Sequence, residues 1–375
     1  MKKNIHFNVV AVGDLMLGDS AKCIGIGVRS RMEKYGVDYV FSNIKKELRG
    51  DIVFGNLECV LSDKKYMKNN FSRAQMIGTP SCVDALKHAG FNSLNVANNH
   101  TMQHGAEGFN ETCNILKKNG FYVIGIRGRD GYTCLPEIIE INNAKIGLLG
   151  YSLTKENYEK KELLYASGSI EDILEDVEKI KNICDYLIVS VHWGDEFVHV
   201  ASKNSKEIGA KLLACGVDLV LGHHSHTPQE ICVKNTSNIF YGLGNFVSDM
   251  IWDSKLRNSL IYKATVKNLV VTKQSIISCF IDSNYRVVKK EELTLDEYIE
   301  KFKNIWENEK LIEYEELVEK MRIRNRNLSH IYVIKNFHKY KSLVFLKILT
   351  NSIMSLYNGY KWKKFNKTWV KYNEK

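Results

Sequence analysis

The sequence predicts an α/β fold with a large domain over residues 1–292 and a helical, basic appendage over residues 293–375. Amphipathic segments that end in glycine lead directly into short apolar runs, and polar clusters follow those runs. The composition, 44% hydrophobic and 26% charged, is that of a globular protein that can bury a sizeable core. The domain boundary is placed near 290–295, where charged helical periodicity replaces strand-like alternation.

Three segments combine an amphipathic stretch, a terminal glycine and an apolar run. The glycines are Gly90, Gly120 and Gly216. Each stands where a helix C-cap favours a left-handed residue, so a helix is predicted before it and a strand after it. Thr79 as N-cap and Pro80 as the first helical residue predict where the first of these helices begins.

Other periodicities complete the predicted elements. Apolar residues at helical spacing predict a helix over 169–184, followed by a strand over 186–191. Residues 137–151 are typical of a hairpin that turns at Asn142 and Asn143. Alternation predicts three antiparallel strands over 260–290, and one or two charged helices are predicted over 294–325.

Cysteine usage and hydropathy indicate the cellular compartment. Nine cysteines are scattered singly without a C-x-x-C pair, which predicts reduced core thiols, and Cys59 stands nearest to a polar cluster. No apolar stretch approaches the roughly 18 residues that span a bilayer. The first apolar run, 7–12, is soon followed by Asp14 and is too short for a signal peptide, so we expect a cytoplasmic location.

The basic character of the chain belongs to its tail. The net charge is +10, but residues 321–375 hold thirteen Lys and Arg against the single acid Glu374. Segment 343–357 is apolar and suits a buried or interfacial helix, and Lys and Trp residues near 361–371 fit a membrane interface. The tail is therefore expected to bind anionic polymer, to lie on an anionic membrane or to pack on the core. No nucleic-acid-binding motif is present.

Five polar clusters follow predicted strands. They hold Asp14; Asn56 and Glu58; Asn98, Asn99 and His100; His192, Asp195 and Glu196; and His223, His224 and His226. Because ligands bind at the carboxyl ends of strands in open α/β sheets, these clusters are expected to meet in one crevice. Any one of them could be a polar core residue or a turn cap, but five in one chain argue against that interpretation.

Imidazole, carboxylate and amide oxygen together suit a borderline divalent metal, so one or two ions of Mn, Zn or Fe are expected. His224 and His226 are two residues apart, and both can point the same way only if that strip is extended.

Six sequence blocks stand in a fixed order between residues 8 and 250. They are GDLML, GNLE, ANNHTM, VHWGDEF, GHHSH and YGLGNF. They resemble the signature blocks of the CapA/PgsA family of poly-γ-glutamate capsule synthesis, a variant of the calcineurin-like metallophosphoesterase fold. The resemblance implies a four-layer αββα sandwich with the helical appendage added at its C-terminus.

The resemblance also implies roles for individual residues. The implied metal ligands are Asp14, Glu58, Asn99, His192, His224 and His226, with Glu58 bridging two metals. His100 resembles the histidine that protonates a leaving group. The side chains expected to support these groups or to face substrate are Asn56, Asn98, Gln103, His223, Asp195, Glu196 and Asn245.

Two positions depart from the phosphoesterase pattern. Met16 stands where classical phosphoesterases have a histidine ligand, and a thioether prefers soft metals. The CapA family usually lacks that histidine too, so this departure follows the family. One of the two metal positions is then short of ligands and is expected to be weak or vacant. Gln103 replaces a common aspartate and removes a negative charge beside His100.

Three functions fit these residues. The first is a metal-dependent enzyme of hydrolase or transferase type in capsule or cell-envelope polymer synthesis, acting on an acidic polymer, peptide or glycan. The second is a non-catalytic, polymer-handling scaffold of a capsule synthase, with the tail holding product or membrane. The third is a metal-dependent peptide-modifying enzyme such as an epimerase. The tail suggests peripheral contact with the inner face of the membrane. The resemblance implies association with capsule synthase subunits.

Overall fold

The computed structural model describes residues 5–64, 75–155, 158, 162–234 and 236–353. Its strands are β1 (His6–Leu15), β2 (Ile52–Leu57), β3 (Val60–Leu61), β4 (Ile77–Gly78), β5 (Ser93–Asn95), β6 (Tyr122–Ile124), β7 (Glu137–Ile141), β8 (Ala144–Ser152), β9 (Tyr186–His192), β10 (Leu219–His223), β11 (Ile231–Lys234), β12 (Ser237–Phe240), β13 (Asn245–Val247), β14 (Asn258–Lys267), β15 (Val270–Ile281) and β16 (Val287–Thr294). Its α-helices are α1 (Val28–Tyr35), α2 (Cys82–Ala89), α3 (Gly105–Lys118), α4 (Ile170–Lys181), α5 (Lys203–Ala214), α6 (Leu295–Lys310) and α7 (Tyr314–Lys335), and residues 342–353 are also helical.

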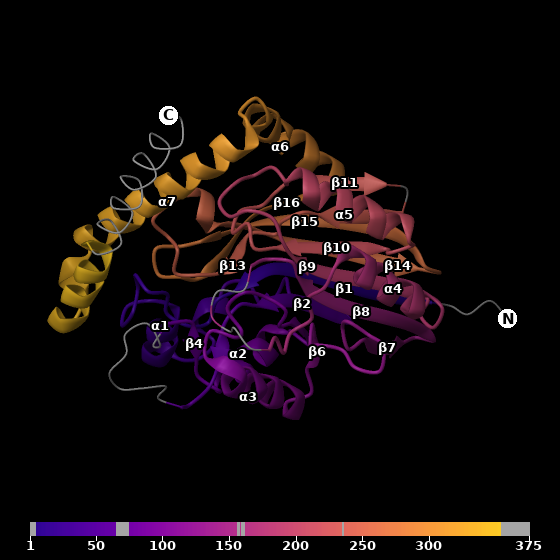
Figure 1. The fold of residues 1–375 in the computed structure, drawn as a ribbon, viewed down its shortest axis with the longest axis horizontal. Coiled ribbons are helices and arrows are strands. Elements are labelled where there is room, and N and C mark those ends of the chain that lie inside the picture. The colour runs from indigo at the N-terminus through magenta and orange to yellow at the C-terminus, as the bar shows by residue number, and fades with distance from the viewer. Residues whose placement is uncertain (1–4, 65–74, 156–157, 159–161, 235, 354–375) are drawn as a thin grey trace, which may run out of the picture.

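Two sheets form the centre of the molecule (Figure 1). The first has the strand order β16-β15-β14-β1-β2-β5-β6, with β13 also paired to β1, and the second has the order β11-β12-β10-β9-β8-β7. In the first sheet β1, β2, β5 and β6 are parallel, whereas β14, β15 and β16 are antiparallel. In the second, β8, β9, β10 and β12 are parallel.

The side chains of β1 show how the layers pack. Val10 and Val12 lie in one apolar cluster with residues of α1, α2 and α3, while Phe7 and Val9 on the opposite face lie in a cluster between the sheets. Alternation along a strand places successive side chains on opposite faces, so β1 is buried on both. A third cluster joins α4 and α5 to the outer face of the second sheet. The predicted α/β class and αββα layering are confirmed.

The predicted turns are also present. Gly90, Gly120 and Gly216 have φ of 112°, 80° and 88°, the left-handed conformation that a helix C-cap favours. Asn142 and Asn143, with φ of 47° and 63°, form the turn between antiparallel β7 and β8.

One predicted boundary is wrong. α2 begins at Cys82 with Ser81 as N-cap, not at Pro80 with Thr79 as N-cap. The Thr79 hydroxyl is hydrogen-bonded to the Ser81 hydroxyl at 2.7 Å, and the Thr79 carbonyl accepts from the Cys82 N–H. Residues 79–82 therefore form a separate turn ahead of the helix.

The C-terminal helices pack on the sandwich. α6 and α7 run along its upper left side in Figure 1, and the buried side chains of Tyr298, Trp306 and Leu317 belong to the apolar cluster between the sheets. The domain boundary at 292/293 stays a prediction. The Lys and Trp residues near 361–371, for which a membrane-interface role was predicted, belong to residues 354–375 and lie outside the described residues. Within the described ranges, no helix is both long and apolar enough to cross a membrane.

The nine cysteines are free, and Cys59 is buried. Burial raises the pKa of the Cys59 thiol to about 12, so it stays protonated at neutral pH and is not poised as a nucleophile.

Candidate metal centre

Strand register places the polar clusters next to one another. Asp14 at the end of β1 is level with Asn56 on β2, and His192 at the end of β9 is level with His223 on β10. Because the two sheets face each other, these pairs meet across the sandwich: the His223 Nδ1 lies 3.3 Å from the Asp14 Oδ1. The expectation that clusters distant in sequence share one crevice is met by this geometry.

Glu58 directly follows β2 and is fully buried. Neither of its carboxylate oxygens has a hydrogen-bond partner in the described structure. Burial, together with the nearby Asp14 carboxylate, raises the pKa of Glu58 well above its usual value. A buried carboxylate without a donor is costly unless a cation compensates it.

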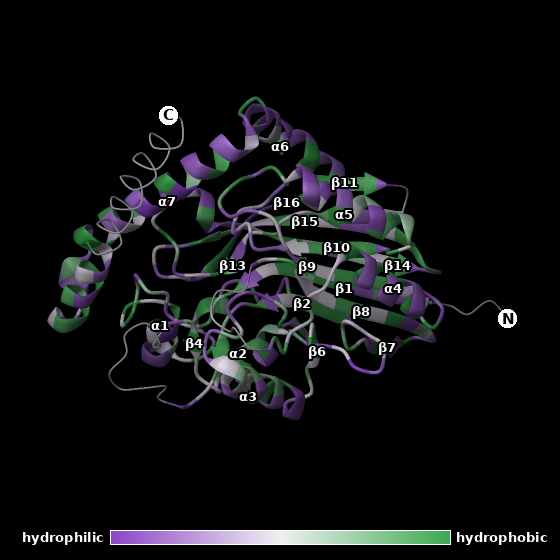
Figure 2. Cartoon of the chain, in the orientation of Figure 1, coloured by the Kyte–Doolittle hydropathy of each residue, from purple (hydrophilic) through white to green (hydrophobic). Residues whose placement is uncertain are grey.

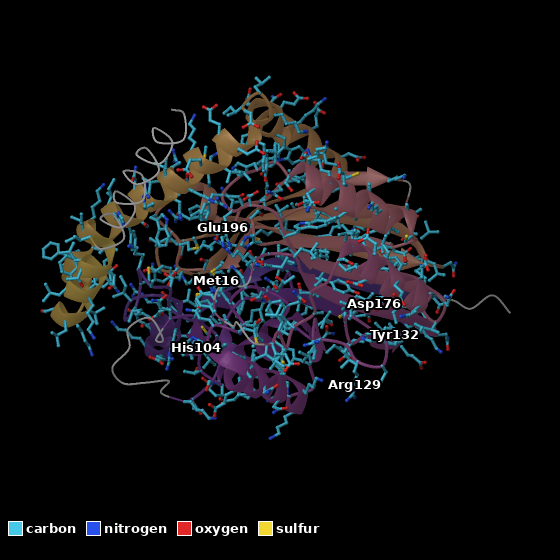
Figure 3. The ribbon with its side chains drawn as sticks, in the orientation of Figure 1. Met16, His104, Arg129, Tyr132, Asp176 and Glu196 are labelled. Carbon is cyan, nitrogen blue, oxygen red and sulfur yellow. The ribbon has the colours of Figure 1, made fainter. Side chains whose placement is uncertain are left out.

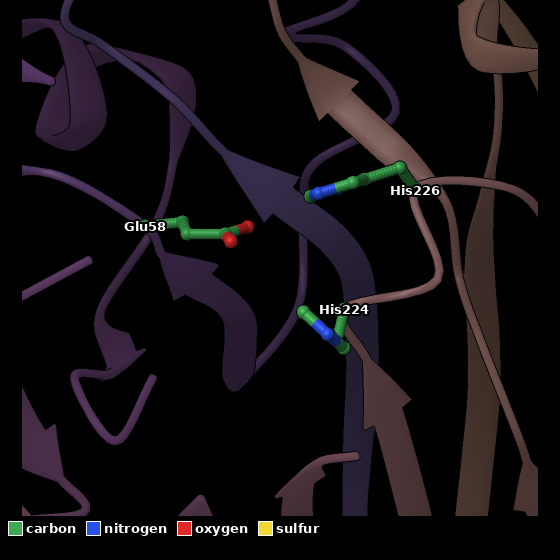
Figure 4. Close-up of side chains that lie close together, drawn as sticks. All are labelled: Glu58, His224 and His226. Carbon is green, nitrogen blue, oxygen red and sulfur yellow. The ribbon is translucent and has the colours of Figure 1, made fainter. Parts of the chain in front are cut away.

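Glu58 belongs to two groups of potential metal ligands. One joins Glu58, His224 and His226 (Figure 4), and the other joins Asp14, Glu58 and His192; within each group the ligand atoms lie within 4.8 Å of one another. If each triad held a cation, the Glu58 carboxylate would contribute to both positions. The unpartnered oxygens and the imidazole and carboxylate donors fit a borderline divalent metal.

His192 is fully buried on β9. Its Nε2 lies 3.0 Å from the Asn99 Oδ1 and 3.6 Å from the Glu58 Oε1. Burial, and then the neighbouring His224, lower the pKa of His192 well below its usual value. His192 is therefore held as neutral imidazole, the form that binds metal ions.

His224 and His226 reach the centre through a backbone conformation that differs from the expected one. Their φ values are 87° and 57°, so the strip is left-handed at both residues, not extended. This twisted loop brings the two ring centroids to 6.0 Å from each other. Burial lowers the pKa of His224 to about 4.

His226 is in a strongly acidic setting. Its Nδ1 lies 3.3 Å from the Asp14 Oδ2, and its Nε2 lies 3.4 Å from the Glu196 Oε1. Although burial opposes its charge, Glu58, Asp14 and Glu196 raise the pKa of His226 well above the usual value. Burial likewise opposes ionisation of Glu196, but its contact with His226 lowers the pKa of Glu196 to about 2. Without bound metal, the protonated His226 partly compensates the acids.

His100 is oriented by Gln103. The His100 Nδ1 lies 2.9 Å from the Gln103 Oε1, which makes Nδ1 the protonated nitrogen of the neutral ring. The other nitrogen, Nε2, then faces the centre, 3.8 Å from the Glu58 Oε1. The His100 side chain is 19% exposed, so it borders the solvent side of the site. A neutral amide thus orients this ring.

Asn56 links the ligand loops. Its Nδ2 donates to the Asp14 Oδ1 at 2.9 Å, and its Oδ1 accepts from Asn95 and Asn98 at 2.9 and 3.2 Å. The Asn98 Oδ1 accepts from the backbone N–H of His100 at 3.2 Å, which shapes the loop that presents Asn99 and His100. Sequence reasoning missed Asn95, the last residue of β5, which lies two residues before the ANNH block.

Two further predicted positions lie beside the centre. Met16 is buried, and its sulfur accepts a hydrogen bond from the Ser248 hydroxyl at 3.4 Å, so this position supplies no nitrogen or oxygen ligand. Asn245 is level with Asp14 in the β1–β13 pairing, and its Nδ2 donates to the Leu256 carbonyl at 3.1 Å. Figure 3 labels Met16 and Glu196 near the centre of the molecule.

A cavity of about 340 Å³ adjoins the centre. Its lining includes Asn99, Thr154, Lys155, Glu196, His224 and Arg322. Asp195 also lines it, but the Asp195 carboxylate is held by the Arg322 guanidinium at 2.9 Å and the Tyr314 hydroxyl at 3.2 Å, both from α7. Sequence reasoning missed Lys155 and Arg322. Lys155 follows β8 and could have been found by the strand-exit rule, whereas nothing in the sequence places Arg322 here.

Comparison with known proteins gives the following matches. The family described as "Bacterial capsule synthesis protein PGA_cap" matches residues 8–250. "Capsule biosynthesis protein CapA" of Bacillus anthracis is 28% identical over 272 residues, which cover 69% of this chain and 64% of that protein. "PGA biosynthesis protein CapA" of Bacillus subtilis (strain 168) is 27% identical over 268 residues, which cover 68% of this chain and 67% of that protein.

The chain thus spans about two thirds of the length of these curated relatives. Among solved structures, a phosphatase from Mycoplasma pneumoniae is similar at 14% identity and a TM-score of 0.44, covering 81% of this chain and 100% of that one. The family match covers more than half of the chain and contains all the strand ends that form the centre. The chain therefore belongs to the bacterial capsule synthesis protein family PGA_cap.

Proposed function

We propose that this protein is a metal-dependent enzyme of hydrolase or transferase type that acts in the synthesis of a capsule or cell-envelope polymer of the poly-γ-glutamate kind. The observation that carries the proposal is the buried Glu58 carboxylate, which has no hydrogen-bond donor among the described residues and is shared by two triads of ligand atoms. Family membership supports a role in capsule polymer synthesis, and the candidate metal centre supports a metal-dependent reaction.

The proposed ligands are Asp14, Glu58, Asn99, His192, His224 and His226. A divalent metal ion held by them would supply Lewis acidity and lower the pKa of a bound water. His100 contributes its Nε2 as the proton-transfer atom, because its Nδ1 is engaged by Gln103. Asn56 and Asn98 fix the loops, so that Asp14 and His100 keep their positions.

The cavity beside the centre supports an anionic substrate. Lys155 and Arg322 line it together with Asn99 and His224 of the centre. The two acids of the lining are already paired, Asp195 with Arg322 and Glu196 with His226. Arg322 already holds the Asp195 carboxylate, and an arginine of this kind can pair with a substrate carboxylate in the same geometry. An acidic peptide or polymer is therefore the proposed substrate class.

Metal content tests the proposal. Purified protein is loaded with Mn²⁺, Zn²⁺ or Fe²⁺, and bound metal is measured by elemental mass spectrometry. We expect about one to two equivalents in the wild type, and large losses for Glu58→Gln, His192→Ala and His224→Ala. His88→Ala is the matched control, because His88 is an exposed histidine on α2. Absence of bound metal under every loading condition would refute the enzyme proposal.

A non-catalytic scaffold is the second candidate function. The observation that favours it is Met16, whose buried thioether occupies a position next to the centre without offering a hard ligand. In that case the chain handles polymer for synthase subunits, and metal binding has a structural role. A protein that binds metal and co-purifies with a synthase, yet turns over no acidic polymer, would select this candidate.

A further inference from the structure

For its length, the described C-terminal segment is richer in exposed apolar side chains than the rest of the described structure. Thirteen large apolar side chains are exposed in the described chain, and six of them lie within residues 331–353. Phe337 is 60% exposed and Leu343 is 75% exposed. Apolar residues that gather in one exposed region mark an interaction site, whereas scattered ones need no explanation.

The helix at 342–353 is apolar on two faces. Val344, Phe345 and Ile348 belong to the cluster that packs this helix against residues 23–26 and Tyr340. The opposite face presents Leu343, Leu346 and Ile353, which are 75%, 53% and 56% exposed. Their spacing of three and seven residues places them in one stripe along the helix. The described residues therefore leave this second apolar stripe exposed.

This orientation is fixed by contacts to the body of the protein. The Lys22 ammonium donates to the Ser352 hydroxyl at 2.7 Å, and the Tyr340 hydroxyl donates to the Lys22 carbonyl at 2.7 Å. The Phe337 ring lies 6.2 Å from the Phe345 ring, which joins the end of α7 to the helix. Figure 2 shows hydrophobic residues on these helices at the left end of the molecule.

Positive charge surrounds the uncovered stripe. Residues 321–353 contain seven Lys and Arg and no acid. Arg322 and Arg324 pair with Asp195 and Asp253 of the body. The remaining basic residues are Arg326 and four lysines, Lys335, Lys339, Lys341 and Lys347. All four lysines are exposed, and within the described part of the chain none of them forms an ion pair.

We propose that this C-terminal surface, formed by the stripe Leu343, Leu346 and Ile353 with the neighbouring Phe337 and the four exposed lysines, docks on an anionic lipid bilayer. Apolar side chains enter the boundary between headgroups and acyl chains, while lysines pair with anionic headgroups above it. An acidic polymer would satisfy the lysines but offers no apolar surface for the leucines. The combination therefore favours a bilayer, and the surface lies outside the proposed metal centre and does not depend on it.

Vesicle co-sedimentation of the full chain tests the proposal. We expect binding to vesicles of phosphatidylcholine with about 30% phosphatidylglycerol, and much weaker binding to phosphatidylcholine alone. Changing the four lysines to Gln weakens binding by about fivefold per lysine. The charge-matched control changes the exposed Lys46, Lys87, Lys118 and Lys203 to Gln and leaves binding within about twofold.

The apolar part has its own variant. Leu343→Ser combined with Leu346→Ser and Ile353→Ser is expected to lower binding by at least about tenfold, and the exposed side chains predict an unchanged melting temperature. The control triple is Leu311→Ser, Ile183→Ser and Val270→Ser, which removes exposed apolar residues elsewhere. Equal binding by wild type and both test variants would overturn the proposal. A second result would also overturn it: light scattering finds a wild-type dimer that the apolar triple variant converts into a monomer, and the wild type does not bind vesicles.

Discussion

At the scale of single residues, Glu58 sets the stability of the metal-free protein. Its buried carboxyl group has no hydrogen-bond donor among the described residues, and burial raises its pKa, so the metal-free fold disfavours its ionised form. Glu58→Gln removes that acid and should leave the metal-free protein at least as stable as the wild type. Added Mn²⁺ should stabilise the wild type by about 2.7 kcal/mol at a hundredfold excess over Kd and leave the variant unchanged. Thermal melts with and without Mn²⁺ check this, and a variant that still gains stability would contradict it.

Asp249 gives the protein a pH dependence away from the centre. Burial and the nearby Asp19 raise the pKa of Asp249 to about 7, compared with about 3.9 in an unfolded chain. The folded state binds the Asp249 proton more tightly than the unfolded state does. The contribution of Asp249 to the unfolding free energy therefore becomes progressively more destabilising as pH rises from about 4 to about 7. Below that window the term vanishes.

Asp249→Asn should remove this term. The difference in unfolding free energy between variant and wild type should therefore shift in favour of the variant by up to about 4 kcal/mol as pH rises through the window. Urea unfolding at about pH 5 and about pH 7.5 should show about 2.5 kcal/mol of this shift, because part of it is already present at pH 5. Asp253→Asn is the control of opposite sign: although burial opposes ionisation, Arg324 lowers the pKa of Asp253, so this variant should lose stability at neutral pH.

At the scale of elements, α7 contributes to the cavity beside the centre. Arg322 lines that cavity and pairs with Asp195 at 2.9 Å, while Arg324 pairs with Asp253 at 2.6 Å and holds the helix in place. Given the proposed anionic substrate, Arg322→Ala should weaken binding of a short γ-glutamyl peptide by about tenfold. Titration calorimetry measures this, and exposed Arg326→Ala is the control. Equal affinities for the two variants would remove Arg322 from substrate binding.

Local patterns predicted the elements and much of the centre. An apolar run followed by Asp14, Glu58 or His192 identifies a strand end, and parallel sheets place such ends along one edge. The backbone of His224 and His226 was not predictable, because left-handed φ at a histidine depends on the surrounding loop.

The contribution of α7 was not predictable for a different reason. Arg322 and Asp195 are 127 residues apart, and their contact depends on how α7 packs against the sandwich. No local sequence pattern in either segment predicts how α7 packs. The positions of the strand ends, by contrast, follow from the strands and the sheets that they form.

At the scale of the whole molecule, the C-terminal helices belong to the main core. Trp306 is 6% exposed and shares the cluster between the sheets with Tyr298 and Leu317. Trp306→Ala should lower the unfolding free energy by about 3 kcal/mol, through lost burial and the space left behind. Ile305→Ala is the matched control on the same helix, because Ile305 is 41% exposed and should change stability by less than about 1 kcal/mol. Chemical denaturation measures both.

The same cluster decides how a chain that ends at residue 292 should behave. Such a chain keeps both sheets except the last two residues of β16, but it loses α6 and α7, whose buried Leu295, Tyr298 and Leu317 belong to the apolar cluster between the sheets. The sheet surface beneath them becomes exposed, and an exposed apolar patch of this kind favours association. We expect this shortened chain to unfold at a lower temperature than the full chain and to aggregate. A shortened chain that stays monomeric and as stable as the full one would instead establish residues 1–292 as an independent domain.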